Sequence, residues 1–176
     1  MPTDPRGFSL LELMTALVVS AVLMAAAAPP LAALAEQQRA SAMANQVLGL
    51  LHAGRLQAIT RGQTVSVCPS RDGRHCGAMD LWSDGMLVQV EPRGARASPQ
   101  VVRSQGAAEL RGLRLVASRG RTAVAFRRDG RAAGTNQTLS LCSHDGRLLR
   151  EIIVSNTGRG RVGTPAPGTR CPGPPT

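Results

Sequence analysis

Two arginines that alternate with glycines near the end of the chain have the residue types and the spacing for binding an anion. They stand in the segment Gly158-Arg159-Gly160-Arg161. The guanidinium group is a planar fork of N–H donors that matches phosphate, and glycine, lacking a Cβ, lets a backbone come close to a ligand. In an extended segment residues two apart point the same way, so Arg159 and Arg161 are expected to present their charges side by side.

The charge of the whole chain agrees with a polyanionic partner. The 176 residues carry a formal net charge of +10, and all 21 basic residues are arginine. Such a charge favours nucleic acid or anionic lipid. The aromatic residues are Phe8, Phe126 and Trp82 alone. Stacking on bases is therefore not expected to be the main mode of binding.

A second basic segment leaves two interpretations open. Residues 111–131 contain seven arginines and one acid, Asp129. The segment is either a solvated sheet face with its hairpin, or a part of the same anion-binding surface. In the second interpretation the additional candidates are Arg127, Arg128 and Arg131. Arg170 is a further candidate, because it lies in the same C-terminal stretch without acids as Arg159 and Arg161.

The sequence contains no pattern that predicts catalysis. The serine-nucleophile, phosphate-loop and metal-carboxylate motifs are all missing from it. The histidines at positions 52, 75 and 144 have no ligand spacing between them. Neither an enzyme nor a cofactor or metal is expected.

A long helix followed by short strands is expected to position these residues. Apolar residues recur at steps of three and four up to about Gly62, which predicts an amphipathic helix. Glycines at positions 49 and 54 would allow close packing on a sheet. The apolar stripe consists of Leu31, Leu34, Met43, Val47, Leu50, Leu51, Leu56 and Ile59. Short β-branched runs predict antiparallel strands at 64–68, 87–90, 100–103, 113–118, 122–127, 138–142 and 151–155. The fold class is therefore α+β.

The start of the chain combines an apolar run with one carboxylate. The 23 residues from Leu13 to Ala35 are uncharged and rise about 34 Å as a helix, enough to cross a bilayer. A cleaved secretory signal and a simple anchor both leave Glu12 unexplained, because a charge in the span weakens insertion. Cleavage after Gly7 would instead make Glu12 the fifth residue of the mature chain, close to a positively charged N-terminus.

This stretch, MPTDPRG followed by FSLLELM, resembles the class III signal of type IV pilins and type II secretion pseudopilins. The resemblance implies that a prepilin peptidase cleaves between Gly7 and Phe8 and methylates the new amine of Phe8. It further implies that Glu12 pairs with the N-terminus of a neighbouring pilin subunit during assembly. Pro29, followed here by Pro30, falls where this family commonly has a helix-loosening proline.

Four cysteines suit a small domain in an oxidising compartment. The pairing Cys68–Cys76 and Cys142–Cys171 is favoured, although four cysteines permit three connectivities. The chain-entropy estimate gives about 2.6 kcal/mol for the shorter loop and about 3.7 kcal/mol for the longer one. Zinc binding, with His75 beside Cys76, is the alternative. A secreted domain behind a membrane anchor favours disulfides.

The remainder of the chain resembles the GspH/FimT group of minor pilins and pseudopilins. The matching stretches are QAITRGQTVSVCPS, LWSDGMLV, TAVAFRRDGR, LSLC and REIIVSNTGRGRV. In FimT-like members a Gly-Arg-x-Arg motif is associated with DNA uptake in natural transformation, and residues 158–161 match it. The resemblance implies a long N-terminal helix, first half transmembrane and second half amphipathic, packed on an antiparallel β domain, and sequence-independent binding of double-stranded DNA. The strand after Trp82, LVQV, is less aromatic here than is usual in the group.

The sequence predicts five segments in the chain, and two other functions remain as alternatives to a DNA-binding minor pilin. The protein is expected in the bacterial inner membrane as a single-pass protein with a periplasmic C-terminal domain, and then in a fibre. The alternatives are a GspH-like pseudopilin or priming subunit with a structural role and no DNA ligand, and a soluble periplasmic protein released near Ala35. The segments are a leader at 1–7, a transmembrane and assembly half-helix at 8–35, an amphipathic half-helix at 36–62, a β-rich domain at 63–162 and a Pro/Gly-rich tail at 163–176.

Overall fold

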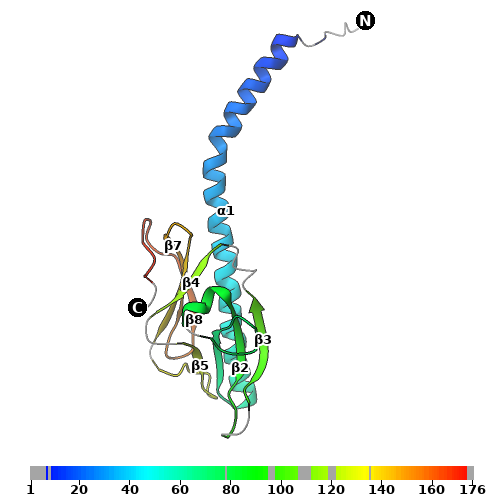
Figure 1. Ribbon diagram of the computed structural model, residues 1–176. Coiled ribbons are helices and arrows are strands. Elements are labelled where there is room, and N and C mark those ends of the chain that lie inside the picture. The colour runs from blue at the N-terminus through cyan, green and yellow to red at the C-terminus, as the bar shows by residue number, and fades with distance from the viewer. Residues whose placement is uncertain are drawn as a thin grey trace, which may run out of the picture. The chain divides into compact units, whose positions relative to one another are not determined.

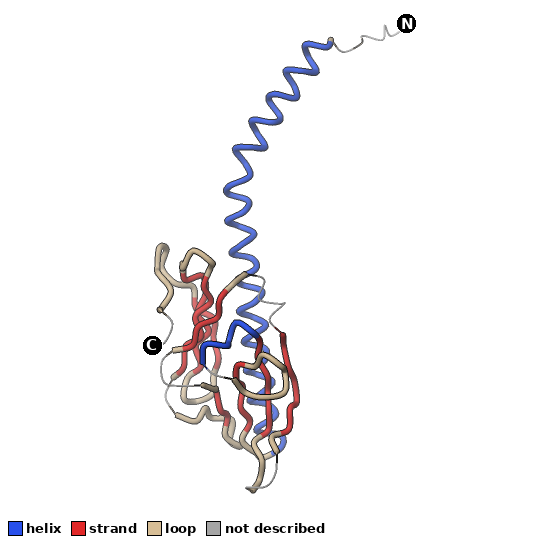
Figure 2. The backbone as a smooth tube through the Cα atoms, in the orientation of Figure 1, coloured by secondary structure: helices blue, strands red, loops and turns tan. Residues whose placement is uncertain are grey.

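A computed structural model of the protein contains two compact units, residues 1–38 and residues 39–176. One long helix comes first in the chain and the strands follow, joined by loops and one short 3-10 helix (Figure 1). Figure 2 shows the same division by type of secondary structure. The described residues are 7, 9–77, 79–94, 98–106, 112–118, 122–134 and 136–173.

The first unit is helical and apolar. Helix α1 (Leu10–Arg61) begins in it, and the described side chains up to residue 35 are exposed. An 18-residue window of α1 has a mean hydropathy of 2.2 and none of it is buried. By length and composition this helix can cross a membrane. The helix is continuous over Pro29 and Pro30, so the loosening expected there does not interrupt it.

The second unit contains two four-stranded antiparallel sheets. The first sheet has the order β3-β2-β1-β5 and the second has the order β4-β6-β7-β8. Each of the seven predicted strands has a counterpart, and β8 is additional. The strands are β1 (Val65–Pro69), β2 (Gly85–Val90), β3 (Gln100–Gly106), β4 (Arg114–Ala117), β5 (Val124–Phe126), β6 (Gln137–Cys142), β7 (Leu148–Val154) and β8 (Gly160–Gly163).

Residues 39–61 of α1 run alongside both sheets (Figure 1). An ideal Cβ on Gly54 would lie 2.8 Å from Cγ2 of Val67 in β1, so the helix backbone comes very close to the first sheet there. On the other sheet, Cδ1 of Leu48 lies against Gly160 of β8. The sequence predicted close packing at glycines 49 and 54, and Gly49 instead has no heavy atom near its Cβ position.

The buried stripe of the helix differs from the predicted one. Within the second unit, Leu56 and Ile59 are 59% and 48% exposed, although their hydrophobicity placed them in the core. Residues 31 and 34, in the first unit, are exposed as well. Small residues occupy the closest contacts, because a large side chain would hold the helix away from the sheets. The buried positions of α1 are Ala40, Met43, Ala44, Val47, Leu50, Leu51, Gly54 and Ala58.

The 3-10 helix η1 (Met79–Asp84) brings the lone tryptophan of the chain into the core. Trp82 is fully buried and is the largest of the buried side chains. Next to it, the Oγ of Ser83 accepts a hydrogen bond of 3.0 Å from the backbone N–H of Leu115. Ser83 therefore joins this turn to β4 of the second sheet, while Trp82 adds its side chain to the core.

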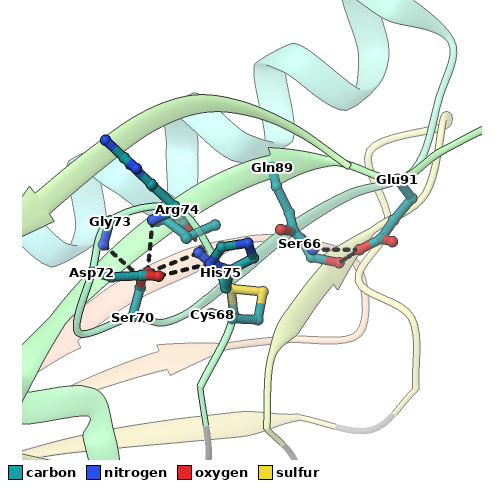
Figure 3. The surroundings of a disulfide bond; sticks show 11 residues. Ser66, Cys68, Ser70, Asp72, Gly73, Arg74, His75, Gln89 and Glu91 are labelled. Atoms are coloured by element: carbon teal, nitrogen blue, oxygen red, sulfur yellow. Dashed lines mark hydrogen bonds and ion pairs between the residues drawn. A yellow bond between two sulfur atoms is a disulfide. The ribbon is translucent and has the colours of Figure 1, made fainter. Parts of the chain in front are cut away.

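The loop after β1 is closed by a disulfide between Cys68 and Cys76, whose Cα atoms are 5.5 Å apart. This is the pairing favoured by the sequence, and it leaves no thiolate for zinc. Inside the loop the Asp72 carboxylate accepts from the His75 ring at 2.7 Å and from the N–H of Arg74 at 2.8 Å (Figure 3). These hydrogen bonds, led by the one from His75, lower the pKa of Asp72 well below its usual value.

A second disulfide holds the C-terminal tail. Cys142 at the end of β6 is bonded to Cys171, with Cα atoms 6.0 Å apart. Beside this bond, the N–H of Leu148 donates to the carbonyl of Thr169 at 2.9 Å and that of Cys171 to Gly146 at 3.0 Å. Residues 164–173, the described part of the tail after β8, contain no helix or strand and are held at the start of β7 by these bonds.

Candidate functional site

The segment 158–161 completes the turn of a β-hairpin and begins its second strand, β8. Strands β7 and β8 pair so that Ile153 stands opposite Arg161 and Val154 opposite Gly160. The connecting turn is closed by a hydrogen bond of 2.9 Å from the N–H of Ser155 to the carbonyl of Arg159. The segment expected to be extended is therefore a paired edge strand, with one arginine in the strand and the other next to it.

The two arginines face away from the core. Gly160 faces α1 and Val162 packs against the core cluster, so the alternating side chains of Arg159 and Arg161 point to the opposite side. Both are exposed, and their guanidinium groups make no hydrogen bond or ion pair to any residue that the structure describes. Together with Ile153, Ser155 and Gly160 they line a surface depression of about 360 Å³. Two free cations thus border one hollow.

The glycines of this segment face protein, in contrast to their expected role of opening the backbone to an anion. Gly158 has φ +79°, and an ideal Cβ on it would lie 2.0 Å from the carbonyl oxygen of Gly130. An ideal Cβ on Gly160 would lie 2.5 Å from Cδ1 of Leu48. The glycines therefore allow the hairpin to dock on another turn and on α1, and this docking positions the arginines.

The turn that Gly158 contacts belongs to the second basic segment, residues 111–131. Residues 127–131 follow β5, with the N–H of Arg127 donating to the carbonyl of Arg131 at 2.8 Å. Arg128 and the two arginines of this hydrogen bond are exposed. The N–H of Ala132 donates to the carbonyl of Asn156 in the hairpin turn at 3.1 Å. The structure thus brings these three predicted residues beside the hairpin arginines.

Arg55 of α1 lies beneath the two turns, and sequence reasoning missed it. Its Nε would be 3.2 Å from an ideal Cβ on Gly130 and equally far from one on Gly158. This Nε is buried and has no hydrogen-bond partner among the described residues. The signal in the sequence was a cation at position 55, next to the buried helix positions 54 and 58.

Arg170 is not part of this group. It forms an isolated β-bridge with Arg147, at the start of β7, whereas the hairpin turn follows Val154 at the end of the same strand. A strand of this length spans roughly 20 Å at about 3.3 Å per residue. The tail disulfide therefore fixes Arg170 at the opposite end of the second sheet.

Of the predicted processing and assembly residues, Glu12 lies in α1 and Gly7 precedes it. Gly7 is described and exposed, and Phe8 lies outside the described residues, as do residues 1–6. Glu12 is the acidic residue in the first turn of α1 and its side chain is exposed. A carboxylate there interacts favourably with the positive end of the helix dipole.

Comparison with protein families identifies the chain. The family described as "Type II transport protein GspH" matches residues 43–158, about two thirds of the sequence. The chain belongs to the GspH family. The prokaryotic N-terminal methylation motif matches residues 4–28, the range that contains Gly7, Phe8 and Glu12.

Two crystal forms of the type IV minor pilin FimU from Pseudomonas aeruginosa share the fold. At 20% identity one covers 70% of this chain and 91% of its own, with a TM-score of 0.52. The other, at 19% identity, covers 77% and 94%, with a TM-score of 0.55. The minor pseudopilin EpsH of the Vibrio cholerae type 2 secretion system covers 74% and 99% at 18% identity, with a TM-score of 0.42. No curated protein matched significantly in sequence.

The family confirms several expectations drawn from the sequence. The fold is the type IV pilin-like α+β fold, a long N-terminal helix packed on antiparallel sheets. The chain is a minor pilin or pseudopilin of type II secretion or type IV pilus systems, a structural and non-enzymatic class. Its partners are other pilins and a prepilin peptidase. An apolar helix with a methylation motif is consistent with residence in the inner membrane followed by assembly into a pilus.

Proposed function

We propose that this GspH-family protein is a FimT-like minor pilin that binds duplex DNA, independently of sequence, for uptake in natural transformation. The observation that carries the proposal is the exposed pair Arg159 and Arg161, held side by side on one hairpin with no partner among the described residues. A net charge of +10 attracts the same polyanion at longer range. The arginines of the neighbouring turn, 127–131, extend the positive surface.

Phosphate is the group of the DNA that this surface fits. Guanidinium groups form forked hydrogen bonds with phosphate oxygens, and such contacts carry no base information. Two of the three aromatic residues of the chain, Phe126 and Trp82, are buried in the core. Stacking on single-stranded bases is therefore not available to them, which favours a duplex bound through its backbone.

The N-terminal half supplies the means of assembly in this proposal. A prepilin peptidase removes residues 1–7 and methylates Phe8, and residues 8–35 hold the protein in the inner membrane as a single span. The amphipathic half-helix 36–62 and the β-rich domain 63–162, with the tail 163–176, lie in the periplasm before the subunit enters the fibre. There Glu12 pairs with the amine of Phe8 on a neighbouring subunit.

The test is DNA binding by the full chain in a non-ionic detergent, measured by fluorescence anisotropy with a labelled duplex over a salt series. Each phosphate contact contributes a slope of about −0.9 to the log–log salt plot, or about a fivefold gain in affinity at about 0.15 M salt relative to about 1 M. Removing both hairpin arginines with Arg159→Ala/Arg161→Ala is expected to weaken binding about 30-fold and to reduce the slope by about 1.8.

A matched control removes the same charge from the rest of the second sheet. Arg114→Ala/Arg170→Ala changes two exposed arginines, one on the far edge strand β4 and one in the tail. Its affinity should stay within a fewfold of the unaltered protein. Equal losses in the two variants would show that only net charge matters. Unchanged affinity in the hairpin variant would leave the family's structural role, without a DNA ligand, as the function.

A further inference from the structure

A cleft of about 410 Å³ lies where α1 ends, and the hairpin arginines do not line it. Its walls are residues 62–64 after the helix, residues 91–93 after β2, and the two arginines Arg127 and Arg128. Three separate parts of the chain therefore meet in it. Only the last of these parts was singled out by the sequence.

The charges at the cleft favour an anion. Three arginines, Arg93, Arg127 and Arg128, line it against one acid, Glu91. The Glu91 carboxylate already accepts hydrogen bonds from Ser66 at 2.5 Å and from Gln89 at 3.4 Å (Figure 3). Thr64 and Gln63 add a hydroxyl and a carboxamide, which are further donors for a tetrahedral anion.

The end of the helix does not cancel this positive charge. Carbonyl groups at a helix C-terminus carry partial negative charge, which would repel an anion. Arg93 donates through Nη2 to the carbonyl of Gly62 at 3.0 Å, and thereby offsets that charge. Arg127 and Arg128 make no side-chain hydrogen bond or ion pair within the part of the chain that the structure describes, so both remain available to a ligand.

One turn joins the cleft to the hairpin. Residues 127–132 border the cleft through Arg127 and Arg128, and they touch the hairpin through Gly130 and the N–H of Ala132. A ligand with anionic groups repeated along its length can therefore contact both places. A compact anion would reach one of them only.

We propose that the cleft is a second phosphate site, which binds a phosphodiester group of the same duplex that the hairpin holds. The proposal rests on the proposed function for the identity of the ligand, but the cleft can be tested on its own. The arginines act as phosphate ligands, and the hairpin and the cleft bind separate phosphates of one DNA molecule.

The first experiment measures duplex binding by Arg93→Ala/Arg128→Ala in the full chain in detergent. Two lost contacts are expected to weaken binding about 30-fold at about 0.15 M salt and to reduce the salt slope by about 1.8. Because Arg93 also holds the helix end, Arg128→Ala alone provides a second variant, with an expected loss of about fivefold. The charge-matched control is again Arg114→Ala/Arg170→Ala. Wild-type affinity in both cleft variants would overturn the proposal.

The second experiment tests the cleft with inorganic phosphate in place of DNA. The ¹⁵N-labelled full chain is titrated with inorganic phosphate, and the backbone amides of residues 62–64 are followed by NMR. Saturable shifts that disappear in Arg93→Ala/Arg128→Ala are expected. Shifts of these amides with phosphate in a protein that does not bind duplex would refute the proposed function and keep the phosphate site. No shift with phosphate, or a stronger response to poly-glutamate, would overturn the site itself.

Discussion

The contact between two glycines makes Gly158→Ala the sharpest test of how the hairpin is held. Gly158 has φ +79°, and an added Cβ would lie 2.0 Å from the Gly130 carbonyl oxygen and 3.2 Å from the Arg55 Nε. Real Cβ atoms essentially never approach within 3.0 Å. The two turns must therefore separate by about 1 Å, which is more than the roughly 0.5 Å range of N–H···O hydrogen-bond lengths.

The expected loss in the free energy of unfolding of Gly158→Ala is the sum of two separate costs. A non-glycine residue in the left-handed region costs about 1–2 kcal/mol. Separation of the turns weakens the hydrogen bond from Ala132 to Asn156, worth about 1 kcal/mol, and the packing around it. Gly158→Ala is therefore expected to lower the free energy of unfolding by about 2–4 kcal/mol. Gly146→Ala is the matched control, because Gly146 has φ +81° and no heavy atom within 4 Å, so it carries only the backbone cost.

Trp82 provides the assay, since it is the only tryptophan and is fully buried. Its fluorescence reports thermal unfolding of the second unit in detergent. At about 2–4 °C per kcal/mol, Gly158→Ala should lower Tm by roughly 4–16 °C, and Gly146→Ala by less. DNA affinity should also fall in Gly158→Ala, although no charge is lost. Equal Tm shifts in the two variants would refute the glycine contact as the feature that positions the hairpin.

Two further predictions concern the second unit and the helix. A hydrogen bond from Ser143 and the Arg147 guanidinium lower the pKa of Asp145 from 3.8 to about 2, so its stabilising effect is full above pH 3.8 and is lost as the pH falls toward 2. Asp145→Asn should therefore flatten the acid dependence of Tm in that window, and an unchanged profile would contradict it. Glu12→Ala should reduce the subunit's recovery in sheared fibres while the Trp82 transition keeps its Tm, because the buried core begins at Ala40. Normal recovery would argue against an assembly contact.

Much of the fold could be predicted because its signals are local. Runs such as residues 64–68 and 151–155 are rich in β-branched residues, and the structure has strands there. Strand β8 was not predicted, because Gly-Arg-Val-Gly contains one β-branched residue between glycines. It is a strand through its hairpin pairing with the preceding strand β7, and the composition of the segment itself does not indicate that pairing.

The helix stripe could be predicted only in part, because hydrophobicity is not the same as closeness of packing. Leu56 and Ile59 match an apolar periodicity, yet the sheets lie against Gly54 and Ala58. A small residue on a helix gives a weak signal of burial in any hydropathy scale. Its role becomes clear only when the opposing surface, here Val67, is known.

The candidate site also has some features that the sequence predicts and others that it does not. The exposed arginine pair could be predicted, since its chemistry is present in four consecutive residues. The role of the glycines could not, because the contact partner of Gly158 is Gly130 in another turn. Arg170 was grouped with the pair on charge alone, and the bridge to Arg147 places it elsewhere. The cleft at the end of α1 needs three segments to meet, so no single stretch of sequence indicates it.

The Cys142–Cys171 bond has a mechanical consequence for the hairpin. It closes a covalent ring that contains β7, the turn and β8, and both ends of that ring meet at the end of β6, an interior strand of the second sheet. A pull on Arg159 or Arg161 is therefore shared between two routes, one through the β7 backbone and one through β8, the tail and the sulfur bridge. Edge strands normally peel one hydrogen bond at a time, and this ring limits how far β8 can peel. The hairpin is therefore attached to the second sheet more firmly than an edge hairpin without such a bond.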